Sequence, residues 1–369
     1  MKISKKTAQK TTFPSELRLD LASSDWVIIA TGRARRPETF KREKRVGEET
    51  SKKDCPFCRK EIENEATLAF AGDKKIKANN LKNWTPLEIS SKDKKNIQIP
   101  KKFLTGWTTL VAPNKFPAFL PHPKLEKKIE GNTYLTMNAV GYHEVIVTRD
   151  HKKSLAQLSI KNVKEVIDAY QKRYLDLMKK PFVNYISIFH NHGREAGASI
   201  SHPHSQLITT PLIDCDLRRA LLNSGGYFKS KRKCIYCEMD RWEKKAKKRI
   251  IFENNNFLVL CPFASKSAFE VIISPKRHRP YFEKITEREK WQLAEAFKVA
   301  LGKLFKALND PAYNFYLHTA PCDGRKYDHF HWHWTIIPKT SVWAGFELGT
   351  GMEISTIEPE RAAEYLRKQ

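Results

Sequence analysis

The chain repeats an ordered series of chemical features, and this repeat restricts its fold more than any other property of the sequence. Each half contains a Cys-x-x-Cys pair, a β-rich run ending in a histidine, an amphipathic stretch, a second β-rich run and a cluster of alternating histidines. The pairs are Cys55/Cys58 and Cys234/Cys237, and the clusters span residues 202–206 and 329–333. His151 and His202 are 51 positions apart, as are His278 and His329. A shared order of this kind predicts two similar folding units in tandem.

The pattern within each unit predicts an α+β fold. In the first half, strand-like runs at 144–148 and 184–190 flank a helical stretch at 154–180; in the second, runs at 270–274 and 314–318 flank a helix at 285–308. This order indicates a mainly antiparallel sheet with a packed helix, made twice. We expect an N-terminal unit at 1–221 and a C-terminal unit at 222–369, joined by a basic linker at 222–233. Strand alternation would place His202, His204 and Gln206 on one face, and His329, His331 and His333 on another.

Composition limits the functional class. About 40% of the 369 residues are hydrophobic, enough for a packed core, and no apolar run reaches the roughly 20 residues of a membrane-spanning helix. The N-terminus lacks the apolar segment of a secretory signal, so we expect a cytoplasmic protein.

The net charge of +26 predicts attraction to anions. Lysine-rich runs at 41–53, 74–102 and 229–248 are interpreted as solvated segments, with nucleic-acid binding as the alternative.

The cysteines favour metal binding over disulfides. Their odd number, seven, and the missing signal argue against a disulfide framework. Four thiolate and imidazole ligands suit tetrahedral zinc, and sites with four protein ligands are typically structural. We therefore expect two Zn²⁺ sites, and Cys215, Cys261 and Cys322 are expected to be buried small residues. The first site would use Cys55, Cys58, His151 and His202, and the second Cys234, Cys237, His278 and His329, with His331 as the alternative to His329.

The segment from Asn191 to Gln206 combines a phosphate-binding pattern with a nucleophile. Gly193 and Gly197 permit close approach of the backbone to an anion, and Asn191, Ser199 and backbone amides can donate hydrogen bonds. A neutral imidazole can attack phosphorus, which makes His204 the candidate nucleophile. Gln206, two residues further, can donate to phosphate oxygens as charge develops. In the second half the segment before His329, at 319–324, is less suited to binding phosphate, so we do not expect a second active site there.

These residues resemble the galactose-1-phosphate uridylyltransferase branch of the histidine triad superfamily, over a stretch from Asp25 to Gly351. The resemblance implies two tandem histidine-triad-like halves, a nucleotidyl group carried by His204 and zinc ligation by His202. It also implies that Gln206 acts in catalysis. The nucleotide and phosphate positions it implies are Arg33, Arg36, Asn114, Asn191, Gly197 and Ser199.

The resemblance implies a double-displacement reaction through a covalent nucleotidyl-histidine. The expected substrates are a nucleotide sugar and a sugar 1-phosphate or phosphate, and UDP-glucose:hexose-1-phosphate uridylyltransferase is the leading expectation. The second Cys-x-x-Cys pair, and the replacement near Ser341 of a lysine that some uridylyltransferases carry, favour the alternative, an ADP-glucose or dinucleotide phosphorylase. The resemblance also implies a homodimer in which Phe346 and Glu347 reach the neighbouring sugar site. An alternative of another class is a zinc-stabilised nucleic-acid-binding protein, which the charge favours and the intact His204 and Gln206 disfavour.

Overall fold

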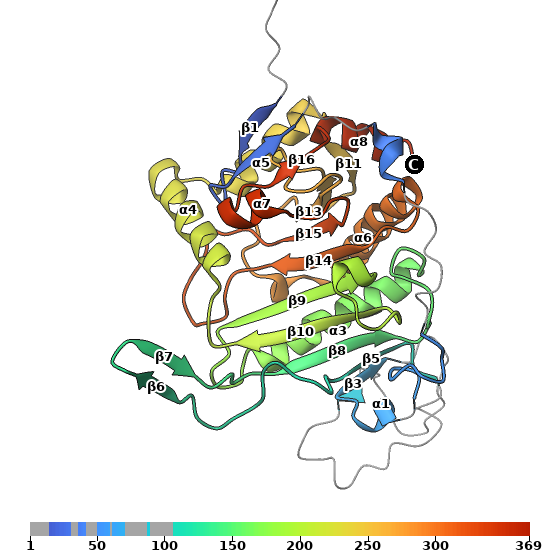
Figure 1. Ribbon diagram of the computed structural model, residues 1–369, viewed down its shortest axis with the longest axis vertical. Helices are drawn as coiled ribbons and strands as arrows, with labels where there is room; N and C mark the ends of the chain where they lie inside the picture. Colours follow the sequence, from blue (N-terminus) through green and yellow to red (C-terminus); the bar gives the residue numbers. More distant parts are fainter. Residues whose placement is uncertain (1–14, 31–35, 42–49, 60, 71–86, 89–105) are drawn as a thin grey trace, which may run out of the picture.

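A single antiparallel sheet runs through both halves of the chain (Figure 1). The computed structural model describes residues 15–30, 36–41, 50–59, 61–70, 87–88 and 106–369. Within them the order of the eleven strands is β11-β12-β13-β15-β14-β9-β10-β8-β5-β3-β4. The strands of this sheet are β3 (Leu68–Phe70), β4 (Leu87–Glu88), β5 (Thr109–Pro113), β8 (His143–Thr148), β9 (Tyr185–His192), β10 (His204–Thr210), β11 (Ile250–Glu253), β12 (Phe257–Leu260), β13 (Val271–Pro275), β14 (Tyr313–His318) and β15 (His333–Pro338).

Two long helices cover one face of the sheet and form the main core with it. Helix α3 (Ile160–Leu177) starts at Ser159, whose side chain accepts from the backbone N–H of Asn162. Helix α6 (Glu287–Leu308) starts with a capping box between Thr286 and Glu289. These caps satisfy backbone donors that the first helical turn leaves without partners. The apolar sides of both helices are buried against the sheet, so the expected α+β class is confirmed.

The positions of equivalent elements show which residues of the two halves correspond. Helices α3 and α6 begin 127 positions apart, as do His151 and His278, whereas β10 and β15 begin 129 positions apart, at His204 and His333. The connection that precedes β15 is therefore two residues longer than the one that precedes β10. In consequence His331, not His329, occupies the position of His202. The shared spacing of 51 aligned the wrong pair, because it assumed connections of equal length.

The remaining elements complete the fold around this sheet. The segment expected to be a linker is mostly helical, and the expected boundary between residues 221 and 222 falls inside α4. Strands β10 and β15 start at His204 and His333, so the histidines before them lie in loops and not on a strand face.

A separate three-stranded sheet joins β1 and β2 to β16 near the C-terminus, and the β6–β7 hairpin projects from the body (Figure 1). These elements are β1 (Glu16–Leu19), β2 (Trp26–Ile29), η2 (Pro37–Phe40), α1 (Glu61–Asn64), β6 (Lys127–Glu130), β7 (Tyr134–Met137), η3 (Arg194–Ala196), α4 (Cys215–Lys231), α5 (Ile235–Ala246), η4 (Phe282–Lys284), α7 (Gly345–Thr350), β16 (Ile354–Ser355) and α8 (Pro359–Arg367).

Candidate active site and metal centres

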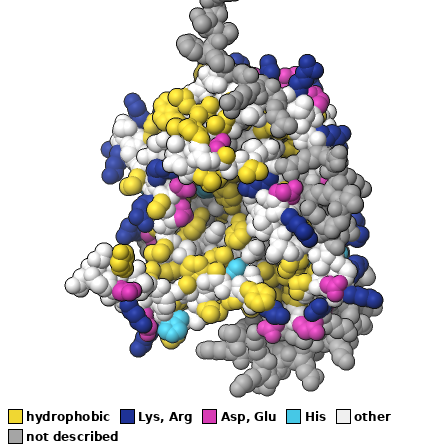
Figure 2. Space-filling model, in the orientation of Figure 1, with side chains coloured by type: hydrophobic (Ala, Val, Ile, Leu, Met, Phe, Trp, Pro, Cys, Tyr) yellow, Lys and Arg dark blue, Asp and Glu magenta, His cyan; other side chains and the backbone are white. Residues whose placement is uncertain are grey.

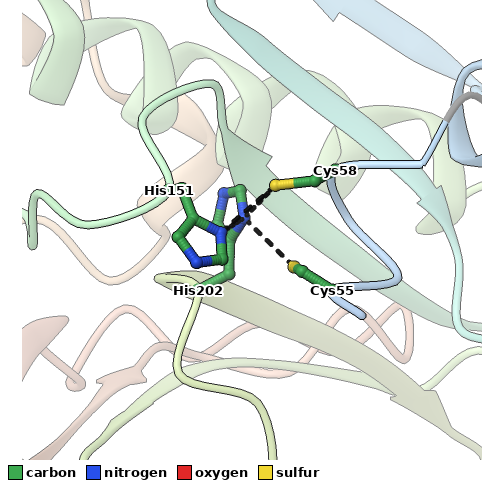
Figure 3. Close-up of side chains that lie close together, drawn as sticks. All are labelled: Cys55, Cys58, His151 and His202. Carbon is green, nitrogen blue, oxygen red and sulfur yellow. Dashed lines mark hydrogen bonds between the residues drawn. The ribbon is translucent and has the colours of Figure 1, made fainter. Parts of the chain in front are cut away.

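Four side chains from three separate segments converge on one point in the N-terminal half (Figure 3). Cys55 and Cys58 come from the loop before α1, His151 from the turn after β8, and His202 from the loop before β10. Their ligand atoms all lie within 4.8 Å of one another. The Cys58 sulfur is 3.2 Å from His151 Nδ1 and 3.5 Å from His202 Nδ1, and the two Nδ1 atoms are 3.2 Å apart.

The hydrogen bonds of the two imidazoles fix which nitrogen faces this point. His151 Nε2 lies 2.8 Å from the Thr50 carbonyl oxygen, and His202 Nε2 lies 2.7 Å from that of Thr148. A carbonyl only accepts, so each Nε2 carries the proton and each Nδ1 presents a lone pair. Two lone pairs facing each other repel unless a cation lies between them. Tetrahedral zinc would give edges of about 3.3 Å between nitrogens and about 3.6 Å between nitrogen and sulfur, close to those observed.

The protonation of these side chains depends on whether a cation lies between them. Burial, with the Cys55 thiol beside it, raises the pKa of Cys58 to about 11, so without a cation the thiol keeps its proton. Burial also lowers the pKa of His202 to about 4, which keeps its imidazole neutral. Thiolate and neutral imidazole are the forms that ligate zinc, and bound zinc favours both. The donor set therefore fits the expected metal.

A second group of the same composition lies in the C-terminal half. Cys234, Cys237, His278 and His331 bring their ligand atoms within 4.8 Å of one another. The Cys237 sulfur is 3.5 Å from His278 Nδ1 and 3.4 Å from His331 Nδ1. His329 lies outside this group: its Nε2 is 3.1 Å from the Leu221 carbonyl oxygen on α4, so the expectation that His329 is a ligand is wrong and the alternative, His331, takes its place.

His204 is held directly beside the first Cys/His group, which is called the first metal group below; the group of Cys234, Cys237, His278 and His331 is the second. Its Nδ1 lies 2.9 Å from the carbonyl oxygen of His202, so Nδ1 donates and Nε2 keeps the lone pair. The Phe57 ring, from the Cys-x-x-Cys loop, packs against the imidazole with centroids 4.8 Å apart. His204 is only 7% exposed, and burial lowers its pKa, so the ring is neutral at neutral pH. His202 thus joins the Cys/His group through its ring and orients the His204 imidazole through its carbonyl.

Gln206 is oriented by a residue that the sequence analysis missed. The Ala118 N–H donates to His143 Nδ1 at 3.1 Å, so the proton of this neutral imidazole is on Nε2. His143 Nε2 then donates to Gln206 Oε1 at 2.8 Å, which leaves the amide N–H₂ of Gln206 for a ligand. The only signal available was a histidine at the start of a buried strand, and nothing in the sequence linked it to a residue 63 positions away.

Asn114 belongs to the same group of contacts. Its Oδ1 accepts from the Phe116 N–H, and its Nδ2 lies 3.0 Å from His143 Nε2, a contact between two donors and not a hydrogen bond in this tautomer. The backbone N–H of Asn114 donates to the His143 carbonyl at 2.8 Å. The expected nucleotide-contacting asparagine therefore lies next to the pair formed by His143 and Gln206.

The glycine-containing loop lies between β9 and β10. Gly193 and Gly197 have φ of 83° and 84°, a region that side chains disfavour, so both turns require glycine. By the strand register His204 lies opposite Asn191 on β9. Asn191 Oδ1 accepts from Asn314 Nδ2 at 2.8 Å, which leaves the Asn191 N–H₂ directed toward Gly197. Ser199 is exposed in the same loop.

Of the two expected arginines only Arg36 is among the described residues, and no described contact joins it to this group. Arg33 lies outside the described residues, and Arg36 is exposed at the start of η2, which packs on α6 and α8. Of the lysine-rich runs, 74–102 lies almost wholly, and 41–53 largely, outside the described residues, whereas 229–248 continues from α4 into α5. Among the described helices none is long and apolar enough to span a membrane.

Comparison with known proteins agrees with this geometry. The family model for the galactose-1-phosphate uridyl transferase N-terminal domain matches residues 88–213, and that for the C-terminal domain matches residues 222–368. An ADP-glucose phosphorylase of Arabidopsis thaliana is 29% identical over 357 residues, 96% of this chain and 92% of the relative. A galactose-1-phosphate uridylyltransferase of Thermotoga maritima is 26% identical over 362 residues, 96% of this chain and 98% of the relative.

Solved structures extend the similarity to the fold. The crystal structure of an ADP-glucose phosphorylase from Arabidopsis thaliana with bound ADP-glucose matches with a TM-score of 0.73 and 27% identity, covering 96% of this chain and 99% of that one. A uridylyltransferase structure matches with a TM-score of 0.66 and 30% identity, covering 71% of this chain and 86% of that one. Two family models in tandem and relatives matched over nearly their whole length lead to one conclusion: the chain is a nucleotidyltransferase that belongs to the galactose-1-phosphate uridylyltransferase family.

Proposed function

We propose that this enzyme moves a nucleoside monophosphate from a nucleoside diphosphate sugar to a phosphate acceptor through a covalent bond to His204. The observation that carries the proposal is the orientation of His204: Nδ1 is engaged by the His202 carbonyl, so the lone pair is on Nε2. A buried, neutral imidazole with one fixed tautomer suits nucleophilic attack on phosphorus.

The two steps balance without an external acid or oxidant. In the first, His204 Nε2 forms a bond to the α-phosphorus, the bond to the sugar 1-phosphate oxygen breaks, and the sugar 1-phosphate leaves. The positive charge on the ring is stabilised through Nδ1–H and the His202 carbonyl. In the second, a phosphate oxygen of the acceptor attacks phosphorus and the bond to nitrogen breaks. The Gln206 amide would donate to a phosphoryl oxygen in both steps.

Zinc would have a structural role in this scheme. Cys55, Cys58, His151 and His202 would hold one ion, and Cys234, Cys237, His278 and His331 a second. Each set has four protein ligands, which leaves no position for substrate in a tetrahedral site. The first ion would fix His202 and, through its carbonyl, the tautomer of His204.

Two substrate pairs follow from the relatives. A UDP-hexose with a hexose 1-phosphate is favoured by the family models and by the uridylyltransferase matched over 98% of its length. ADP-glucose with inorganic phosphate is favoured by the phosphorylase, which is 29% identical and similar over 96% of this chain.

Intact-mass spectrometry after mixing with each nucleotide sugar tests both. A uridylyl adduct from UDP-glucose supports the first pair, and an adenylyl adduct from ADP-glucose supports the second. Either adduct must disappear in His204→Asn. The proposal fails if that variant still forms the adduct, or if neither nucleotide sugar modifies the wild type.

A further inference from the structure

The C-terminal half reproduces the environment of the nucleophile around His333. His333 Nδ1 lies 3.1 Å from the His331 carbonyl oxygen, as His204 Nδ1 does from that of His202. The Tyr236 ring packs against His333 at 5.5 Å between centroids, in the place of Phe57. Nε2 of His333 again carries the lone pair, and no donor among the described residues reaches it.

The groups around His333 differ from those around His204, because neither amide side chain is repeated and the neighbouring histidine is not repeated either. With the offsets of 127 and 129 between the halves, His318 stands in the place of Asn191, Glu270 in that of His143, and Thr335 in that of Gln206. The His318 ring stacks on His333 with centroids 4.6 Å apart. The amide groups that would bind phosphoryl oxygens in the first half therefore have no counterpart here.

His333 lines a cavity of about 660 Å³. The cavity lies between one side of β13, β14 and β15 and a cover made by α4, α5 and residues 19–25. Figure 2 shows apolar side chains and carboxylates around the hollow in this face of the molecule. By strand spacing the centre of the cavity lies about 20 Å from His204, so His204 and His333 face separate sites.

The charge of this cavity is opposite to that of the whole chain. Eight carboxyl side chains and only two basic ones line it, in a protein of net charge +26. Both basic groups are neutralised: Lys266 lies 2.7 Å from Asp25, and Arg249 lies 2.7 Å from Glu243. No cation remains in the lining for a phosphate, so the field in the cavity disfavours an anion.

Glu270 gives the cavity a buried carboxyl group. The residue is 6% exposed, and its Oε2 accepts from the Lys266 backbone N–H at 2.6 Å. The Ser267 backbone N–H also donates to this carboxyl group, and burial, with Asp20 nearby, raises its pKa to about 7. A buried carboxyl group of this kind is stabilised by a cation beside it.

Aromatic rings in the cavity lining supply the remaining contacts for a ligand. Tyr236, Trp242, Phe263 and Phe330 line the cavity together with Tyr316. Aromatic faces and carboxylates attract organic ammonium ions, and rings exclude water from an apolar body. We propose that this cavity is a second ligand site, which binds an organic ammonium ion with an apolar body, its N–H groups directed to Glu270 and His333.

Three probes of one shape test the charge preference. The full-length, metal-loaded protein is titrated calorimetrically with 2-phenylethylammonium, 2-phenylethanol and phenylacetate. We expect the ammonium to bind about tenfold more tightly than the alcohol, and phenylacetate not to bind. The inference is overturned if the alcohol or the carboxylate binds as well as the ammonium, or if none of the three binds at millimolar concentration.

Variants locate the binding. Glu270→Gln keeps an acceptor for the Lys266 N–H and removes the charge, so the ratio between ammonium and alcohol should fall toward one. Glu364→Gln, on the exposed side of α8, is the matched control and should leave the ratio unchanged. His204→Asn should bind the ammonium as the wild type does, since the proposal does not depend on nucleotidyl transfer. An unchanged ratio in Glu270→Gln, or lost binding in His204→Asn, would place the probe elsewhere and refute the assignment.

Discussion

His143 should act on catalysis only through Gln206, and two substitutions can separate its hydrogen bonds. An asparagine amide reaches about as far as Nδ1 of histidine, so His143→Asn should retain the acceptor for the Ala118 N–H and lose the donor to Gln206. A glutamine reaches about as far as Nε2, so His143→Gln should retain the donor. The two variants test one contact in the same buried position.

The magnitude follows from the contact that is lost. The bond from His143 Nε2 to Gln206 Oε1 is 2.8 Å long, and a neutral hydrogen bond of this kind contributes about 0.5–1.5 kcal/mol. Without this bond the Gln206 amide can flip, so that its oxygen and nitrogen exchange positions. Transfer should then slow by about 2- to 13-fold, since about 1.4 kcal/mol is a factor of ten. Gln206→Ala removes the donor to phosphate altogether and should slow transfer by about 10²–10³.

The assay is the single-turnover rate of adduct formation on His204, measured by rapid quench and intact-mass spectrometry. His143→Asn should be slower than His143→Gln, and the exposed His122→Asn should match the wild type. In a double variant, His143→Asn should add nothing to Gln206→Ala, because its effect passes through that side chain. If the two effects multiply instead, His143 acts independently of Gln206 and the reasoning is refuted.

The remaining predictions concern the nucleophile and the two metal groups. His204→Asn should abolish adduct formation while melting temperature and bound zinc stay at wild-type values; retained transfer would contradict the mechanism. The adduct rate should be flat above pH 6.5 and fall only at lower pH, because burial lowers the pKa of His204 from 6.5 and the neutral ring attacks; an acid limb centred above pH 6.5 would contradict this. Cys58→Ala should lower bound zinc, measured by elemental analysis, by about one ion per chain and lower the melting temperature, since zinc binding contributes to folding. His331→Ala should remove the second ion and His329→Ala should not; equal zinc content in these two variants would contradict the geometry.

The sequence by itself determined the parts of this protein that local patterns encode. The order of motifs predicted two tandem α+β units, because apolar periodicity reports which side of a helix or strand is buried. It also identified Cys55, Cys58, His151 and His202 as one group, since their residue types suit a single kind of ligand chemistry. The glycines at 193 and 197 were recognisable because few other residues adopt positive φ.

Tertiary structure decided what depends on the register between distant segments. Whether His329 or His331 joins the second group depended on a connection two residues longer before β15, which only strand pairing reveals. The contact between His143 and Gln206 joins residues on neighbouring strands, and the cavity beside His333 is closed by α4 and α5. A sequence records which residues can make such contacts, but only the packed sheet brings their side chains within hydrogen-bonding distance.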